Sequence, residues 1–150
     1  DKGKRYWADV DIKKLITLYE YAGLADKNEG TFLSNNLNEH GCIRSTIAYL
    51  VGGAFRARGI YDESTKWLEN AVRIDNGEFP DGYWTYFDLE LQIMNLIEIG
   101  EFDQAAKKYG ETWALLAKEP EPFSGHEKAM KEIGKVFQEK RDRDCAAKNK

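Results

Sequence analysis

The sequence predicts an all-α fold, and three observations lead to that prediction. Apolar residues recur at spacings of three and four along most of the chain, which is the period of an amphipathic helix. The strict alternation of apolar and polar residues that marks a half-buried strand is missing throughout. Two apolar stripes end at a glycine that an aromatic residue follows two positions later, at Gly59 with Tyr61 and at Gly100 with Phe102. Helices joined by such short turns form antiparallel hairpins.

Composition and charge are those of a single globular domain. Of the 150 residues, 42% are hydrophobic and 32% are charged, unlike a disordered or a membrane protein. The formal net charge of −4 lacks the basic footprint of a nucleic-acid-binding protein, so we expect no nucleic-acid partner. No apolar run approaches the roughly 20 residues that span a bilayer, and we expect no direct membrane span. We predict one helical-repeat domain over residues 1–140 and a frayed, charged tail over residues 141–150.

The N-terminal part predicts one clear helix and one weaker one. The clear helix begins at Asp9 or Asp11, either of which can cap it, and ends near Gly23. Its apolar face consists of Ile12, Leu15, Ile16, Tyr19 and Ala22. After a polar stretch over residues 26–30, we expect a short helix within residues 31–40.

Residues 43–116 carry the strongest helical signal. Apolar stripes run over residues 43–59 and 61–72, and two more run over residues 86–100 and 102–116. Between these pairs lies the sequence Asn-Gly-Glu-Phe-Pro-Asp-Gly over residues 76–82, whose composition is typical of a loop. We therefore predict two helical hairpins separated by that loop.

A last helix is expected after Pro120 and Pro122, which end the helix before them. Ser124 and Glu127 have the spacing of a capping box and would begin it. Its apolar face consists of Ala129, Met130, Ile133, Val136 and Phe137. The whole chain then holds about seven helices, arranged as three hairpins and a terminal helix.

The two central hairpins resemble tetratricopeptide repeats. That family has a small residue within the first helix, a glycine at the turn, an aromatic residue after it, and alanine on the second helix. The first hairpin matches at Gly52, Phe55, Gly59, Tyr61, Leu68 and Ala71, with Ser64 in place of the usual alanine. The second hairpin matches at Gly100, Phe102, Ala105 and Tyr109, with Ile93 and Thr112 at two positions where the family has a small residue. The resemblance is strongest over residues 45–116.

The spacing departs from that of the family by one insertion. Gly59 and Gly100 are 41 residues apart, whereas a tetratricopeptide repeat has about 34 residues. The loop over residues 76–82 accounts for the excess. The resemblance implies a right-handed array of stacked antiparallel helical hairpins, which the last helix would cap at its exposed end.

The resemblance also implies that a peptide or a partner helix binds in a concave groove, lined by the first helix of each hairpin. The candidate partner-binding residues on those helices are Tyr49, Arg56, Phe87, Glu90 and Met94. Aromatic and methionine side chains with a few charges suit a short apolar or amphipathic ligand. The alternative is that these side chains pack against a neighbouring helix. The lysine and asparagine residues with which some family members hold a terminal carboxylate have no counterpart here, so we do not expect that role.

An aromatic cluster around residues 79–87 is a second candidate surface. It consists of Phe79, Tyr83, Trp84, Tyr86 and Phe87. We expect Trp84 to be at least half exposed and to bind a partner, because tryptophan and tyrosine supply large rigid contact areas. The cluster could equally stack on sugars or bases, or fold back and be buried.

Signals for catalysis and metal binding are weak. His126 and Glu127 begin a zinc-protease helix motif that lacks its second histidine. His40 and Cys42 are a single pair of potential metal ligands. Cys42 and Cys145 lack metal-ligand spacing, and nothing in the sequence supports a disulfide between them. We predict no metal and no cofactor. An enzyme would require a carboxylate pair assembled in space, which a sequence does not reveal.

The sequence thus predicts a non-catalytic scaffold or adaptor that binds a protein or a peptide. The alternative is a helical enzyme or ligand-binding domain that acts on carbohydrate or peptide and uses the aromatic cluster. A homodimer contact through the same aromatic surface is a third interpretation. The sequence does not fix a compartment: a cytoplasmic location is slightly preferred, and an extracytoplasmic one would suit a processed fragment.

Overall fold

The computed structural model describes residues 10–27, 43–78, 83–119 and 123–150, with residues 24–27, 43, 76–78, 83 and 84 described by their backbone only. The short helix expected within residues 31–40, together with His40, Cys42 and Phe79, lies outside the described residues.

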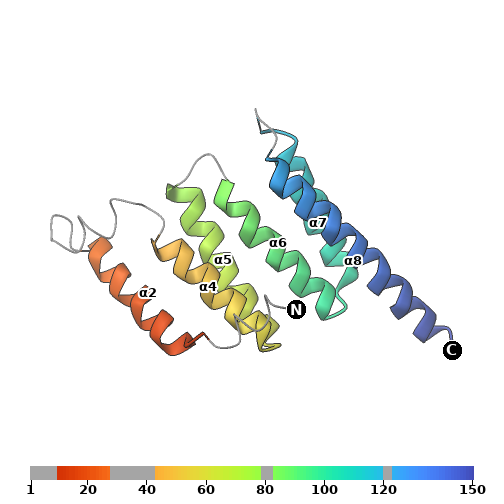
Figure 1. The fold of residues 1–150 in the computed structure, drawn as a ribbon, viewed down its shortest axis with the longest axis horizontal. Coiled ribbons are helices and arrows are strands. Elements are labelled where there is room, and N and C mark those ends of the chain that lie inside the picture. The colour runs from red at the N-terminus through yellow and green to blue at the C-terminus, as the bar shows by residue number, and fades with distance from the viewer. Residues whose placement is uncertain (1–9, 28–42, 79–82, 120–122) are drawn as a thin grey trace. The chain divides into compact units, whose positions relative to one another are not determined.

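All of the regular structure in the described segments is helical, which confirms the all-α prediction. The helices are α2 (Ile12–Lys27), α4 (Ile43–Ala57), α5 (Tyr61–Glu78), α6 (Tyr83–Glu98), α7 (Phe102–Leu116) and α8 (Ser124–Lys148) (Figure 1). None of these six helices is both long enough and apolar enough to cross a membrane. The stacking of hairpins that the tetratricopeptide resemblance implies stays a prediction.

The chain forms two compact units, Asp1–Asp88 and Leu89–Lys150. The first unit holds α2, α4, α5 and the beginning of α6, and within it α4 packs against both α2 and α5. The second unit holds the rest of α6 with α7 and α8, and α7 packs against α8. The single domain expected over residues 1–140 stays a prediction.

The two turn glycines have the role that the sequence predicts for them. Gly59 has a φ of 74° and Gly100 a φ of 80°, in the left-handed region that favours glycine. After α4, the N–H of Ile60 donates to the carbonyl of Phe55 at 2.9 Å and that of Gly59 to Arg56 at 3.0 Å. The same pair of bonds follows α6, from Glu101 to Leu96 at 2.9 Å and from Gly100 to Ile97 at 3.1 Å. Both ends are Schellman motifs, so local backbone chemistry makes each turn.

Close approach of α4 and α5 explains the glycine in the middle of α4. A Cβ atom on Gly52 would lie 2.8 Å from Cγ of Leu68 and 3.2 Å from the carbonyl oxygen of Ser64. Leu68 and Ser64 are fully buried on the facing side of α5. The core of the first unit therefore forms around this contact; its buried apolar residues are Ala22, Ile47, Ala48, Val51, Ala54, Leu68, Ala71 and Tyr86.

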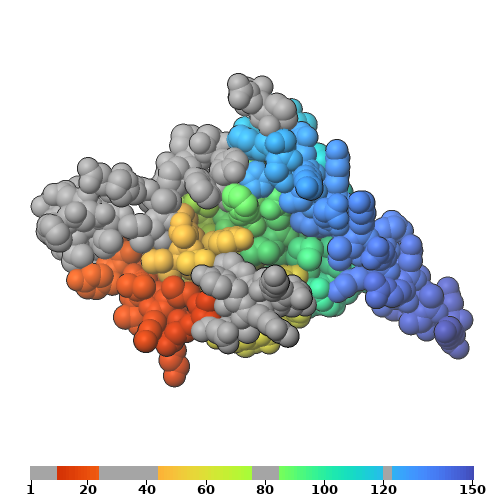
Figure 2. Space-filling model, viewed as in Figure 1, coloured from red at the N-terminus to blue at the C-terminus, as the bar shows by residue number. Residues whose placement is uncertain are grey.

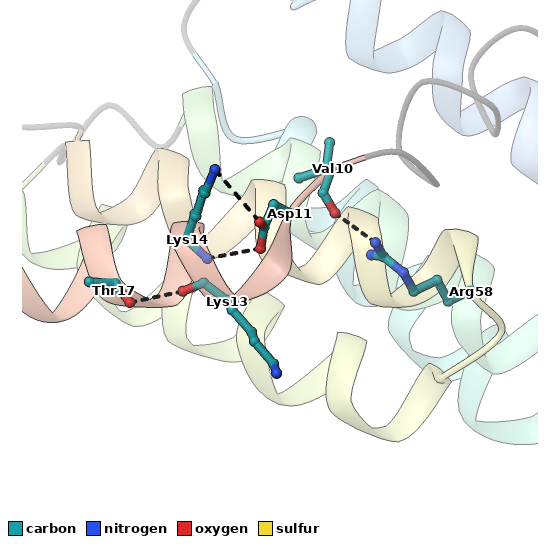
Figure 3. Close-up of polar contacts among 6 residues, drawn as sticks. All are labelled: Val10, Asp11, Lys13, Lys14, Thr17 and Arg58. Atoms are coloured by element: carbon teal, nitrogen blue, oxygen red, sulfur yellow. Dashed lines mark hydrogen bonds and ion pairs between the residues drawn. The ribbon is translucent and has the colours of Figure 1, made fainter.

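The start of α2 is capped by Asp11, as the sequence allows (Figure 3). Oδ1 of Asp11 accepts a hydrogen bond from the N–H of Lys14 at 3.2 Å, and the hydroxyl of Thr17 donates to the carbonyl of Lys13 at 3.0 Å. The guanidinium of Arg58, beyond the end of α4, donates to the carbonyl of Val10 at 2.6 Å. That bond fixes the entry to α2 beside the turn between α4 and α5.

Two helices run further than the sequence predicts. α2 continues to Lys27, so Gly23 lies within the helix and does not end it. α5 continues to Glu78, so residues 76–78 of the expected loop are helical and residues 79–82 lie outside the described residues. Composition favours a loop at Asn76 and Gly77, but helix propensity is a weak signal that context overrides.

α8 differs from its prediction at both ends. Phe123 takes the N-cap position and no side chain caps the helix, so the capping box predicted at Ser124 and Glu127 does not form. At the other end the helix runs to Lys148, where composition predicts a frayed tail from residue 141. Ion pairs one turn apart support these exposed turns, at 3.8 Å between Arg143 and Glu139 and 2.9 Å between Lys148 and Asp144. The last turns of α8, dark blue in Figure 2, extend beyond the rest of the second unit.

The N-terminal half of α8 contributes to the core of the second unit. His126, Met130 and Ile133 are buried, and Phe137 meets Phe102 edge to face with ring centroids 5.8 Å apart. A Cβ atom on Gly134 would lie 2.6 Å from the hydroxyl oxygen of Tyr109 on α7. This half of α8 therefore covers apolar surface of its own unit. That it caps a stacked array stays a prediction.

Candidate functional site

A small cavity in the first unit gathers side chains from three helices. Its volume is ≈ 240 Å³. The residues that line it are Ser45, Thr46, Tyr49 and Leu50 from α4, Asp75 from α5, and Phe87 and Asp88 from α6. The residues on α4 recur at helical spacing, so one face of that helix forms one wall of the cavity.

Two of the predicted partner-binding residues meet at this cavity. The rings of Tyr49 on α4 and Phe87 on α6 have centroids 6.3 Å apart and planes 69° apart, which is an edge-to-face contact. Both side chains are half-buried. The sequence placed these residues on the first helices of two different hairpins, and the structure brings them together.

Two buried carboxyl groups form the polar part of the cavity wall. Asp75 is 3% exposed and Asp88 is 1% exposed. Burial, a hydrogen bond to Asp75 and the negative charge of Asp75 raise the pKa of Asp88 to about 10. Asp88 is therefore protonated at neutral pH, and its carboxyl group donates a hydrogen bond to Asp75.

Apart from the bond within the pair, each of these carboxyl groups has an oxygen atom without a hydrogen-bond partner among the described residues. These atoms are Oδ1 of Asp75 and Oδ2 of Asp88, and both are inaccessible to solvent. Buried polar atoms in native proteins are almost always hydrogen-bonded, because an unmade bond costs about 1–3 kcal/mol. The hydrogen bond within the Asp75–Asp88 pair is therefore the partner that the described residues offer these carboxyl groups.

The sequence interpretation missed both aspartates, although a signal for each was present. Asp75 follows Leu68 and Ala71 on the buried face of α5 at helical spacing, where an apolar residue is the usual occupant. Asp88 lies on α6 beside the aromatic Phe87. A carboxyl group on the apolar face of a helix needs a partner, but which helix supplies it depends on tertiary packing.

The other predicted partner-binding residues lie elsewhere. Arg56 is half-buried on α4 and does not line the cavity, and the side chain of Trp84 lies outside the described residues. Met94 is half-buried on α6, in the second unit. Their part in binding a partner stays a prediction, as does that of Glu90.

Glu90 and His126 form a buried pair in the second unit. Glu90 is 8% exposed and His126 is 3% exposed. A hydrogen bond of 2.7 Å joins Oε1 of Glu90 to Nδ1 of His126. The bond ties α6 to α8, and a short ion pair of 2.7 Å between Glu98 and Lys140 does so again further along. The histidine of the partial zinc motif thus contacts a carboxylate, and no group of three potential metal ligands occurs within the described segments.

Comparison with protein-family models, with curated proteins and with solved structures finds no match to this chain. The case for a function therefore comes from the geometry of the chain itself.

Proposed function

We propose that this chain is a non-catalytic protein-interaction module that holds one side chain of a peptide or partner helix in the cavity between α4 and α6. The observation that carries the proposal is the meeting of Tyr49 and Phe87 at the wall of that cavity. Half-buried aromatic rings that surround a small pocket are typical of the anchor sites that dominate protein–protein binding energies.

The size of the cavity favours a side chain over a whole small molecule. Pockets that enclose drug-sized ligands measure about 300–1,000 Å³, and this cavity measures ≈ 240 Å³. A single large side chain inserted from a partner fits that space. Its surroundings on α4, including Thr46 and Leu50, would contact neighbouring residues of the partner.

The position of the cavity agrees with the tetratricopeptide resemblance. If α4 with α5 and α6 with α7 are successive stacked hairpins, α4 and α6 are their first helices. The groove that such arrays use for binding lies on first helices. The proposed site is therefore where the resemblance implies a partner.

Selection from a displayed library of random peptides tests the proposal. We expect a set of peptides to bind the wild-type chain, and we expect Tyr49→Ala and Phe87→Ala each to weaken that binding at least about tenfold, as loss of an anchor side chain does. Tyr21→Ala is the matched control, because Tyr21 is an aromatic residue 49% exposed on α2. Equal binding to all four proteins, with helicity verified by circular dichroism, would rule out the cavity as the anchor site.

The carboxyl pair supports a second candidate, a hydrolase that acts on peptides or carbohydrates. Two carboxyl groups that share a proton can act together as acid and base, and Phe87, from the predicted aromatic cluster, lies beside them. We rank the binding role first because of the size of the cavity. The scissile bond of a peptide or a polysaccharide lies in the middle of that polymer, whereas a cavity of side-chain size admits the end of a side chain more readily than the middle of a polymer.

A direct assay separates the two candidates. Incubation of the protein with a mixed peptide library and with oligosaccharides, followed by mass spectrometry, detects any cleavage. Turnover that Asp75→Asn abolishes would favour the hydrolase, because the amide cannot act as a base. Peptide binding without turnover would favour the interaction module.

A further inference from the structure

We propose that the groove between α7 and α8 is a second interaction surface, which binds an acidic amphipathic helix of a partner. The groove lies wholly within the second unit and shares no residue with the cavity between α4 and α6. The inference therefore goes beyond the proposed function and does not depend on it.

The size and openness of the groove point to an occupant larger than a side chain. Its volume is ≈ 700 Å³, against ≈ 240 Å³ for the cavity between α4 and α6. Most of the residues that line it are exposed, so the groove is open along its length. An amphipathic helix that lays its apolar face into a groove is a recurring mode of peptide recognition.

The apolar part of the groove depends on a glycine. The side chains of Ala106, Tyr109 and Phe137 line this part. A Cβ atom on Gly134 would lie 2.6 Å from the hydroxyl oxygen of Tyr109, so the glycine lets the end of the tyrosine side chain lie against the backbone of α8. Such a surface suits the apolar stripe of a helix, with residues at i, i+3, i+4 and i+7.

Lysines from one face of α8 form the charged part of the groove. Lys128, Lys131 and Lys135 follow one another at spacings of three and four residues and extend over about 10 Å of the helix. Among the described residues, Glu132 is the only acidic one that lines the groove, and it pairs with Lys135 at 3.2 Å. Within the described segments, Lys128 and Lys131 form no ion pair. The groove therefore has two positive charges that an acidic partner can pair with.

The charge of the groove is opposite to that of the chain. Three lysines and one glutamate line the groove, whereas the whole chain has a formal net charge of −4. A nucleic acid or an anionic membrane extends beyond the groove and would also meet the acidic remainder of the chain, which repels it. A single helix with carboxylates beside its apolar stripe meets mainly the groove, because charges further away than about 8 Å are screened. We therefore infer an acidic helix as the occupant.

A designed peptide tests the inference by fluorescence anisotropy. The probe is a labelled, stapled helix of about 16 residues, with leucine along one stripe and glutamate on both sides of it. We expect saturable binding to the wild type. Combining Lys128→Glu with Lys131→Glu should weaken binding at least about tenfold, because each lost ion pair contributes up to about fivefold and charge reversal adds repulsion.

The matched control combines Lys13→Glu with Lys66→Glu. It makes the same change in net charge at two exposed positions of the first unit, and its affinity for the probe should equal that of the wild type. A probe with lysine in place of glutamate supplies the charge swap. It should bind the Lys128→Glu, Lys131→Glu variant more tightly than it binds the wild type.

Ala106→Trp separates the groove from its charge. Ala106 is exposed and lines the apolar part, so a tryptophan there should fill the groove and weaken binding at least about tenfold without any change in charge. Backbone amide NMR shifts on addition of the probe should cluster at Ala106, Tyr109 and Gly134. Tyr49→Ala should bind the probe like the wild type, so this test and that of the proposed function can fail separately.

Three results would overturn the inference. The first is equal affinity for a probe with glutamine in place of glutamate, and the second is wild-type affinity in the Lys128→Glu, Lys131→Glu variant of verified helicity. The third is co-sedimentation with phosphatidylserine vesicles that this variant loses, with no binding of the peptide probe. That last result would assign the lysines to a membrane surface.

Discussion

At the residue scale, the Asp75–Asp88 pair couples the fold to pH. Asp88 is protonated in the folded protein, because burial and the neighbouring charge of Asp75 raise its pKa to about 10. In the unfolded chain an aspartic acid has its ordinary pKa of about 4. Between these two values the unfolded state binds fewer protons than the folded state, so the free energy of unfolding falls as pH rises.

We therefore expect this one group to lower the free energy of unfolding of the wild-type chain as pH rises between about pH 4 and pH 10. Asp88→Asn should lack that contribution, because an amide is neutral at every pH and can still donate a hydrogen bond to Asp75. Urea denaturation of both proteins at pH 5, 7 and 9 measures the difference. Parallel pH profiles would contradict the assigned protonation of Asp88.

At the element scale, helix ends and helix contacts follow from different kinds of information. Gly59 and Gly100 end α4 and α6 through bonds within a few residues, so the sequence predicts both turns correctly. Asp11 caps α2 for the same local reason. Helix propensity and exposed ion pairs along the helix, such as that between Lys148 and Asp144, determine where α8 ends. Composition alone predicts this end poorly.

Replacement of Gly52 tests the close approach of α4 to α5. In Gly52→Ala the new Cβ would lie 2.8 Å from Cγ of Leu68, so we expect the helices to separate and the free energy of unfolding to fall by about 1–3 kcal/mol. Chemical denaturation measures this change.

The control for that substitution is Gly110→Ala on α7. Gly110 also lies within a helix, but a Cβ atom there meets nothing within 4 Å. We expect a gain of roughly 0.5–1 kcal/mol, because alanine loses less conformational freedom than glycine in a helix. Similar destabilisation of both variants would show that some cause other than the α4–α5 contact governs the effect at Gly52.

At the scale of the whole molecule, α8 is expected to keep the second unit soluble. His126, Met130 and Ile133 are buried on it, whereas the turns beyond Lys140 are mostly exposed. A chain that ends at residue 122 would uncover the apolar surface that these residues now cover and should aggregate. A chain that ends at Arg141 lacks only turns that are mostly exposed, and it should stay monodisperse in size-exclusion chromatography with light scattering. A soluble, fully helical chain ending at residue 122 would contradict this role of α8.

The sequence predicts the fold class and half of the candidate site. Tyr49 and Phe87 are recognisable because aromatic residues on the first helices of two hairpins are left outside the apolar stripes. Asp75 and Asp88 are not recognisable as site residues, because they form a pair only when the packing of two helices brings them together from different parts of the chain. Glu90 shows the converse: its position suggests a groove residue, and the structure places it against His126 in a buried pair.

The most direct test of the central claim is to map, by backbone amide NMR shifts, where the tightest peptide from the random library binds. The account predicts that the largest shifts cluster at the cavity residues Ser45, Thr46, Tyr49, Phe87 and Asp88, and that Tyr49→Ala removes them. Shifts confined to other faces of the protein, unchanged by that substitution, would contradict the claim that the cavity between α4 and α6 holds the partner.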